Sequence, residues 1–378
     1  MKVLFAGDFV PRERVAELIS LKRYDDIFPG NLRKKIQSSD FSFVNLECPI
    51  ADKNFKPISK YGPNLFCKND VVDSLKYLGF TGVTLANNHI LDYGKEGLNT
   101  TVECCKKEKL DVVGVGENIQ QANRVLYLHK KGETLAIINC CEHEFSIATQ
   151  NEAGANPLNP VRQFYSIQEA RSKADYIVIV VHGGHEHFHL PSPRMKETYR
   201  YFIDAGVDAV INHHQHCYSG YEVYKEKPIF YGLGNFCFDR EIQRNTSWSE
   251  GYLVELELEK GKSKFNIIPY LQGCDKPGIL LLEDEESQNK FFSNVSSLNN
   301  IIADDVKLSL LHKEWMSKYS KHFILALEPY VGGFLTMLYM RNLLPSFITK
   351  KRSLQLLNYL QCESHLDRIR CVINDKLK

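Results

Sequence analysis

Three histidines lie within four positions of the chain, in the segment VINHHQH at residues 210–216. His214 and His216 are two residues apart, and residues at that spacing on an extended segment point to the same side. Seven of the thirteen histidines fall between positions 182 and 216, a concentration that a solvated loop does not need. The spacing therefore predicts that His214 and His216 face one metal site.

Polar side chains also follow the other apolar runs that we expect to be strands. They are Asp8 after VLFAG, Asn45 and Glu47 in FSFVNLE, Asn88 and His89 after VTLAN, and His182 after YIVIVV. The carboxyl ends of strands in an α/β sheet open onto one crevice, so we expect these side chains to converge. Carboxylates with imidazoles suit zinc, manganese or iron, which predicts a site for one or two divalent ions.

Some polar residues near these strand ends have an equally good structural explanation. A single histidine at a strand end is more often hydrogen-bonded than metal-bound, which leaves His185, His187, His189 and His213 open. Asp92, in HILDYG, could equally cap a helix or form a turn. The segment GLGNF at 232–236 could be only a tight turn. The structural explanation is weaker for the strand-end set, because coincidence would have to act at five strands.

Alternation of short apolar strands with amphipathic helical patterns extends from the start to about residue 215 and indicates an α/β fold. The predicted strands are 2–7, 41–47, 82–87, 111–116, 174–184 and 207–214, and the predicted helices are 70–80, 94–110 and 192–206. Hairpin patterns at 124–141, 221–236 and 251–271 add antiparallel strands. We therefore expect at least one mixed sheet, or two sheets packed together.

The character of the chain changes near residue 283, where the acidic segment LEDEESQNK begins a polar stretch. Helical periodicity dominates from Asp304 onward. We predict a main domain over 1–282 and a helical region over 283–378. The second region carries no motif to which chemistry can be attached.

Composition limits the partners. Lys and Arg number 47 against 46 for Asp and Glu, so no net field attracts nucleic acid or an anionic membrane unless the charges segregate in space. The uncharged run between Glu328 and Arg341 is too short for a transmembrane span, which takes about 20 residues. The first residues lack a secretory pattern, and the eleven cysteines are odd in number without a C-x-x-C pair. We expect reduced thiols and a cytoplasmic protein.

Competing catalytic motifs fail on spacing. A P-loop ending at Gly261-Lys262-Ser263 would need glycine at position 256, where Leu256 stands. The segment GVGENIQ lacks G-x-G-x-x-G spacing, and the chain has no G-x-S-x-G nucleophile elbow. Simple dinucleotide-binding and serine-hydrolase functions lose support.

Eight motifs occur in a recognisable order between residues 2 and 240. They are AGDF, VNLECPI, LANNHILDYGKEGL, VVGVGEN, VVHGGHEHFHLPSP, INHHQH, GYEVY and IFYGLGNF. This succession resembles the CapA-type poly-γ-glutamate capsule-synthesis family, whose domain is similar to the calcineurin-like metallophosphoesterases. The resemblance implies an α/β (α+β) fold of four layers, with two β-sheets packed face to face and helices outside.

The resemblance also implies roles for particular residues. Six of them would bind the metal, namely Asp8, Glu47, Asn88, His182, His214 and His216. His89 would protonate the leaving group, and the residues expected to contact substrate or support the ligands are Asn45, Asp92, His185, Glu186, His213 and Asn235. One departure is that Phe9 and Val10 stand where the superfamily usually continues Asp-x-His. A second ion then depends on compensation by Glu47, His185 or Glu186.

The function implied is a metal-dependent hydrolase, phosphoesterase-like, acting on an anionic phosphoester in capsule or cell-surface polymer biosynthesis. One alternative is a γ-glutamyl amide-forming or amide-cleaving component of a polymer synthase complex. The missing P-loop argues against autonomous ATP-driven ligation but not against a subunit of such a complex. The other alternative is a non-catalytic metal-binding partner of capsule-synthesis proteins.

Overall fold

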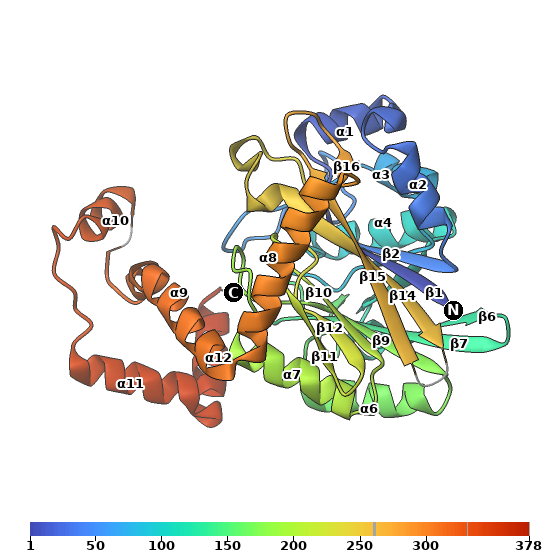
Figure 1. The fold of residues 1–378 in the computed structure, drawn as a ribbon. Helices are drawn as coiled ribbons and strands as arrows, with labels where there is room; N and C mark the ends of the chain where they lie inside the picture. The colour runs from blue at the N-terminus through green and yellow to red at the C-terminus, as the bar shows by residue number, and fades with distance from the viewer. Residues whose placement is uncertain (260–261, 331, 378) are drawn as a thin grey trace. The chain divides into compact units, whose positions relative to one another are not determined.

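Two mixed β-sheets form the centre of the larger of two units in the computed structural model, which describes residues 1–259, 262–330 and 332–377. The larger unit is Met1–Ser309 and the smaller is Leu310–Lys378. The predicted α/β class with mixed sheets is confirmed. Figure 1 shows the strands of the two sheets and the helices that cover them.

The first sheet has parallel strands on one side and antiparallel strands on the other. Its order is β16 (Ile279–Leu281), β15 (Lys262–Gln272), β14 (Glu250–Glu259), β1 (Lys2–Phe9), β2 (Phe41–Leu46), β3 (Gly82–Thr84) and β4 (Asp111–Val113), with β13 (Asn235–Cys237) paired to β1. The pairs from β1 to β4 are parallel, and β14 is antiparallel to both β1 and β15. The predicted hairpin at 251–271 is confirmed as β14 and β15, while its turn at 260–261 lies outside the described residues.

The second sheet contains the histidine-bearing strands. Its order is β11 (Tyr221–Tyr224), β12 (Lys227–Phe230), β10 (Ala209–His213), β9 (Tyr176–His182), β7 (Glu133–Cys141) and β6 (Leu126–Lys130). The four strands β7, β9, β10 and β12 are parallel, and the two hairpin partners β6 and β11 are antiparallel. A separate pair is formed by β5 (Val115–Gly116) and β8 (Gly154–Ala155).

The sheets pack face to face through apolar side chains that alternate with outward-facing ones. Phe5 and Val254 of the first sheet share one buried cluster with Val178, Val180 and Ile211 of the second. Helices cover the outer faces, so the expected four layers are present (Figure 1). On the first sheet they are α1 (Glu13–Ser20), α2 (Gly30–Gln37), α3 (Asp70–Leu78) and α4 (Gly94–Lys107), and on the second α6 (Pro160–Arg171) and α7 (Pro193–Asp204).

The start of α7 follows directly from its sequence. The side chain of Ser192 accepts a hydrogen bond from the backbone N–H of Met195, and Pro193 occupies the first helical position. Such a cap satisfies an N–H that has no partner inside the helix, and proline loses nothing there. An equivalent arrangement begins α6, where the side chain of Asn159 accepts from the N–H of Arg162 and Pro160 occupies the first helical position.

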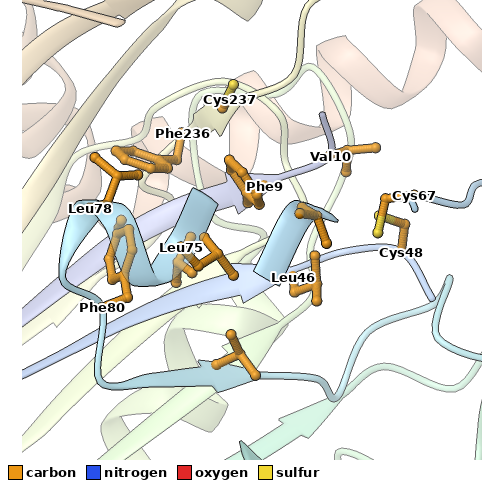
Figure 2. Packing of buried hydrophobic residues seen from close by; sticks show 14 of the residues in the cluster. Phe9, Val10, Leu46, Cys48, Cys67, Leu75, Leu78, Phe80, Phe236 and Cys237 are labelled. Atoms are coloured by element: carbon orange, nitrogen blue, oxygen red, sulfur yellow. The ribbon is translucent and has the colours of Figure 1, made fainter. Parts of the chain in front are cut away.

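One buried cluster fixes the carboxyl ends of β1 and β2 against α3. Phe9 and Leu46 pack there with Leu75 of α3 and Phe236 of β13 (Figure 2). Successive side chains on a strand point to opposite faces. Because Phe9 and Leu46 face the helices, their neighbours Asp8 and Glu47 turn to the other side.

A close backbone approach places β13 against β1. A Cβ on Gly7 would lie 1.9 Å from the carbonyl oxygen of Gly234, so only glycine fits. The N–H of Asp8 donates to that same oxygen at 3.2 Å. The segment 232–236 is therefore more than a turn, because it carries Asn235 to the end of β1.

The polar stretch near residue 283 begins a helix that packs on the larger unit, and the domain boundary at 282/283 stays a prediction. Helix α8 (Glu285–Ala303) belongs to the larger unit, where Phe291 and Val295 enter the cluster between the sheets. The side chain of Asn299 accepts from the N–H of Tyr221 at 2.7 Å. The polar residues at 283–290 therefore begin a helix on the main core.

The smaller unit is helical. Helix α9 (Asp305–Leu325) leads into it, followed by α10 (Gly333–Met340), α11 (Lys350–Gln361) and α12 (Glu363–Leu377). Among the residues that the structure describes, none of the helices has the length and apolarity to cross a membrane.

Candidate metal centre

The predicted ligands meet at the carboxyl ends of strands from both sheets. Asp8 ends β1 and Glu47 follows β2, while His182 ends β9 and His214 follows β10. All four residues are buried. The two sheets therefore bring carboxylates from one side and imidazoles from the other into one crevice.

The first group of ligand atoms comes from Glu47, His182 and His214. His182 Nε2 lies 3.3 Å from Glu47 Oε1, 3.1 Å from His214 Nδ1 and 3.0 Å from Asn88 Oδ1. Three other atoms of ligand type thus lie within 3.3 Å of His182 Nε2. Asn88 lies with this group, as its position beside the predicted strand end implied.

The second group comes from Asp8, Glu47 and His216. His216 lies between the two carboxylates, with Nδ1 at 3.6 Å from Asp8 Oδ2 and Nε2 at 3.8 Å from Glu47 Oε1. Both His214 and His216 have positive φ, 89° and 56°, a backbone region that non-glycine residues rarely adopt. The turn that presents the two imidazoles is therefore held in place by its surroundings.

Glu47 is common to both groups, and its carboxylate has no hydrogen-bond donor. Both of its oxygens are buried without a hydrogen-bond partner in the described structure. Burial, with the nearby Asp8 charge, raises the pKa of Glu47 well above its usual value. Burial also raises the pKa of Asp8 to about 6, although hydrogen bonds from Asn45 and His214 lower it.

The imidazoles are shifted in the opposite direction. Burial lowers the pKa of His182 well below its usual value and those of His213 and His216 to about 3. These groups are therefore neutral, which is the form that binds metal. The Glu47 carboxylate, which has no donor, lies beside neutral imidazoles and the carboxylate of Asp8. This donor set would be stabilised by a divalent cation, so the residues fit a metal ion.

His89 lies beside this group and is paired with Asp92. Its Nδ1 is 2.6 Å from Asp92 Oδ2 and 3.2 Å from Lys60 Nζ, and Lys60 also forms an ion pair with Asp92. The carboxylate of Asp92 further accepts from the N–H of Leu65 at 2.6 Å. Asp92 therefore orients His89 and ties the loop at 58–65 to it. It does not cap a helix, since the Asp92 side chain is fully occupied by these contacts.

Three further predicted residues lie beside the ligands. Asn45 donates to Asp8 Oδ1 at 2.7 Å and lies 3.2 Å from His182 Nδ1. Asn235 Oδ1 lies 3.0 Å from His216 Nδ1, and its amide donates to the backbone oxygens of His216 and Trp248. His213 Nδ1 lies 3.5 Å from Asp8 Oδ1. Asn45 and Asn235 thus orient their neighbours through hydrogen bonds, whereas His213 Nδ1 is buried without a hydrogen-bond partner in the described structure.

His185 and Glu186 lie in the loop after β9, where His185 is half-buried and Glu186 exposed. Neither belongs to the two groups of ligand atoms found among the described residues. Three residues could replace the histidine ligand that Phe9 and Val10 do not supply, and of these only Glu47 belongs to the two groups of ligand atoms. Val10 itself is buried in the helix-side cluster of Figure 2.

Two residues of the site were missed by sequence reasoning. Glu144 follows β7, and its carboxylate lies 3.4 Å from Asn88 Nδ2 and 3.8 Å from His214 Nε2. The signal for Glu144 was its position three residues after the end of β7 (Glu133–Cys141), which the hairpin pattern at 124–141 obscured. Lys60 had no such signal, because a lysine in a polar loop is ordinarily exposed, whereas this side chain is 3% exposed.

Residues 2–240 match the model of a bacterial family described as "Bacterial capsule synthesis protein PGA_cap". The chain belongs to this family. The match covers β1 through β13, and thus every strand end that contributes to the candidate metal centre. The resemblance inferred from eight ordered motifs is confirmed.

Two curated relatives and one solved structure are similar over most of the chain. The capsule biosynthesis protein CapA of Bacillus anthracis is 29% identical over 334 residues, 85% of this chain and 80% of that protein. The PGA biosynthesis protein CapA of Bacillus subtilis is 33% identical over 270 residues, 70% of each chain. A structure described as a novel phosphatase from Mycoplasma pneumoniae has a TM-score of 0.45 at 16% identity, covering 78% of this chain and 98% of that one.

Proposed function

We propose that this protein is a metal-dependent phosphoester hydrolase that acts in the biosynthesis of a capsule or another cell-surface polymer. The observation that carries the proposal is the carboxylate of Glu47, which is buried without a donor and belongs to both groups of candidate ligand atoms. A purely structural glutamate in that position would be expected to have hydrogen-bond donors. A site for Zn, Mn or Fe explains why it has none.

The candidate ligands form two groups that share one residue. Glu47 lies in both groups, His182 and His214 with Asn88 complete one, and Asp8 with His216 complete the other. A divalent ion bound there would supply hydroxide at neutral pH and offset the charge of phosphoryl oxygens. Orientation of the ligands falls to Asn45 and Asn235.

His89 is the proposed general acid. Asn88 and His89 are adjacent, and the structure turns Asn88 toward His182 and His89 toward Asp92. Within the described part of the chain both side-chain contacts of His89 use Nδ1. This leaves Nε2 as the nitrogen that delivers a proton to a departing oxygen. Such a proton transfer contributes typically ~10²–10⁴-fold to rate.

A second candidate rests on the name of the Bacillus subtilis relative, a PGA biosynthesis protein. The same centre could polarise an amide of a γ-glutamyl polymer, in a complex whose other subunits supply ATP chemistry. The two candidates share metal ligands and differ in the bond that changes.

A product assay on the metal-loaded protein separates them. Phosphate release is measured from a panel of phosphomonoesters and phosphodiesters, and amine release from γ-glutamyl peptides. Phosphate release that falls sharply in His89→Asn for substrates with poor leaving groups, but persists in the exposed control His129→Asn, supports the hydrolase. Amine release alone supports the second candidate. Neither product from a protein that retains metal would leave a non-catalytic metal-binding role.

A further inference from the structure

The near-neutral charge of the whole chain hides a strong separation between its two units. Residues 310–378 carry eleven Lys and Arg against five Asp and Glu, a formal charge of +6. Residues 1–309 carry the other 36 and 41, a charge of −5, and the two give the net +1 of the chain. The smaller unit is therefore a basic module joined to an acidic one.

The same unit exposes apolar side chains close together in sequence. Six of them, here called the apolar tip, are Phe334, Leu335, Met337, Met340, Leu343 and Phe347. Phe334 is 69% and Leu343 64% exposed. The tip is followed by three consecutive exposed cations, at positions 350–352. Neither Lys350 nor Lys351 has an ion-pair partner among the described residues.

Internal hydrogen bonds order the segment that carries the apolar tip. The buried carboxylate of Glu328 accepts from the N–H of Phe347 at 3.0 Å and from the hydroxyls of Tyr339 and Ser346. Lys321 donates to the carbonyl of Met340 and the side chain of Asn342. These polar groups are thus paired within the segment, while the six side chains of the apolar tip remain exposed.

We propose that the unit Leu310–Lys378 binds the surface of an anionic lipid bilayer, with the apolar tip inserted among the acyl chains and Lys350, Lys351 and Arg352 on the lipid phosphates. Apolar side chains beside a basic run are the combination that binds membrane interfaces. A soluble polyanion would engage only the cations and would leave the apolar tip in water. A second copy of the unit would bring two charges of +6 together, which opposes self-association.

Vesicle co-sedimentation of the full-length protein tests the proposal. Vesicles of phosphatidylcholine alone are compared with vesicles of phosphatidylcholine and phosphatidylglycerol at 7:3. We expect binding to the mixed vesicles at low ionic strength, weaker binding as salt is raised, and little binding to the neutral ones.

Two paired variants with matched controls locate the contact. Lys350→Gln/Lys351→Gln should weaken binding about tenfold or more, since each basic residue near an anionic surface contributes substantially. The same change in Lys106→Gln/Lys107→Gln, an exposed lysine pair of α4, should leave binding unchanged.

The apolar contribution is tested by Phe334→Ser/Leu343→Ser against the control Val161→Ser/Ile242→Ser, which removes equally exposed apolar groups from the larger unit. We expect loss of binding only in the first pair, with circular dichroism unchanged in both.

Three results would overturn the proposal. They are absence of binding to anionic vesicles, binding that survives both tip and lysine variants, and sedimentation of the free protein as a dimer that Phe334→Ser/Leu343→Ser dissociates. The last would assign the apolar tip to a second copy. None of these results depends on catalytic activity, so the proposed hydrolase function stands or falls separately.

Discussion

Glu47 is the residue on which the candidate metal centre depends, because both groups of ligand atoms include it. Its position just after β2 was predictable, since polar residues at strand ends of an α/β sheet converge. Its lack of donors was not, because that depends on side chains brought from β1, β9 and β10. The same limit explains Glu144 and Lys60, which reach the site only through the tertiary fold.

His89→Asn tests the division between metal binding and proton transfer. We expect metal content to be unchanged and turnover of poor leaving groups to fall by about two to four orders of magnitude, the range for losing a general acid. Substrates with a nitrophenolate leaving group should lose least, because the departing oxygen scarcely needs a proton. Steady-state kinetics on both substrate classes gives the comparison. Equal losses for good and poor leaving groups, with metal still bound, would reduce His89 to an orienting role.

His213 gives a pH test in the metal-free protein. Its folded pKa of about 3 lies below its usual value of 6.5, because burial disfavours the charged ring. The neutral form is favoured by folding, so its contribution is present above pH 6.5 and is lost as pH falls toward 3. Asp8 has the opposite sign, since its raised pKa makes its contribution fall as pH rises from about 4 to 6.

His213→Gln should therefore flatten the acid side of the stability curve. As pH falls from 6 to 4, the wild type should lose about 1.4 kcal/mol of unfolding free energy per pH unit relative to the variant. Urea unfolding in the presence of a chelator measures this difference, and His129→Gln is the exposed control. Parallel curves for wild type and His213→Gln would show that His213 titrates normally.

At the scale of elements, the helix-side cluster around α3 sets where β1 and β2 end. Phe9 and Leu46 are anchored there by Leu75, and this leaves Asp8 and Glu47 facing the metal centre (Figure 2). The strands and helices named from periodicity were found close to the predicted positions. The pattern at 221–236 failed in one respect, since β13 pairs with β1 in the other sheet instead of continuing its hairpin. Local alternation cannot show this, because the pairing depends on the contact of Gly7 with Gly234.

Leu75→Ala tests the anchoring. Leu75 is fully buried, so its truncation should lower the free energy of unfolding by about 2–5 kcal/mol. The exposed Leu21→Ala should change it by less than about 0.5 kcal/mol. Chemical denaturation measures both variants. A loss below about 1 kcal/mol in Leu75→Ala would show that the cluster repacks freely.

At the scale of the whole molecule, the compact units are Met1–Ser309 and Leu310–Lys378, while the domain boundary at 282/283 stays a prediction. Composition suggested the earlier boundary because the exposed side of α8 is polar, whereas Phe291 and Val295 on its buried side complete the core. Net charge was equally uninformative. A total of +1 conceals two units of opposite sign.

Truncated chains test this division. Residues 1–309 should fold cooperatively and keep bound metal, because every candidate ligand lies before position 217. Residues 1–282 should be less stable or less soluble, because removal of α8 uncovers apolar surface at Tyr218 and Tyr252. Thermal unfolding and elemental analysis follow both. Metal loss from a folded 1–309 chain would place a ligand in the smaller unit.

Elemental analysis of Glu47→Gln tests the central claim most directly. The wild-type protein should hold at least one equivalent of a divalent metal after loading and desalting, and Glu47→Gln should lose it while remaining folded. Glu255→Gln is the matched control, a buried glutamate of β14 that pairs with Leu4 at the opposite end of β1, and it should keep the metal. A folded Glu47→Gln protein with the metal content of the wild type would contradict the account.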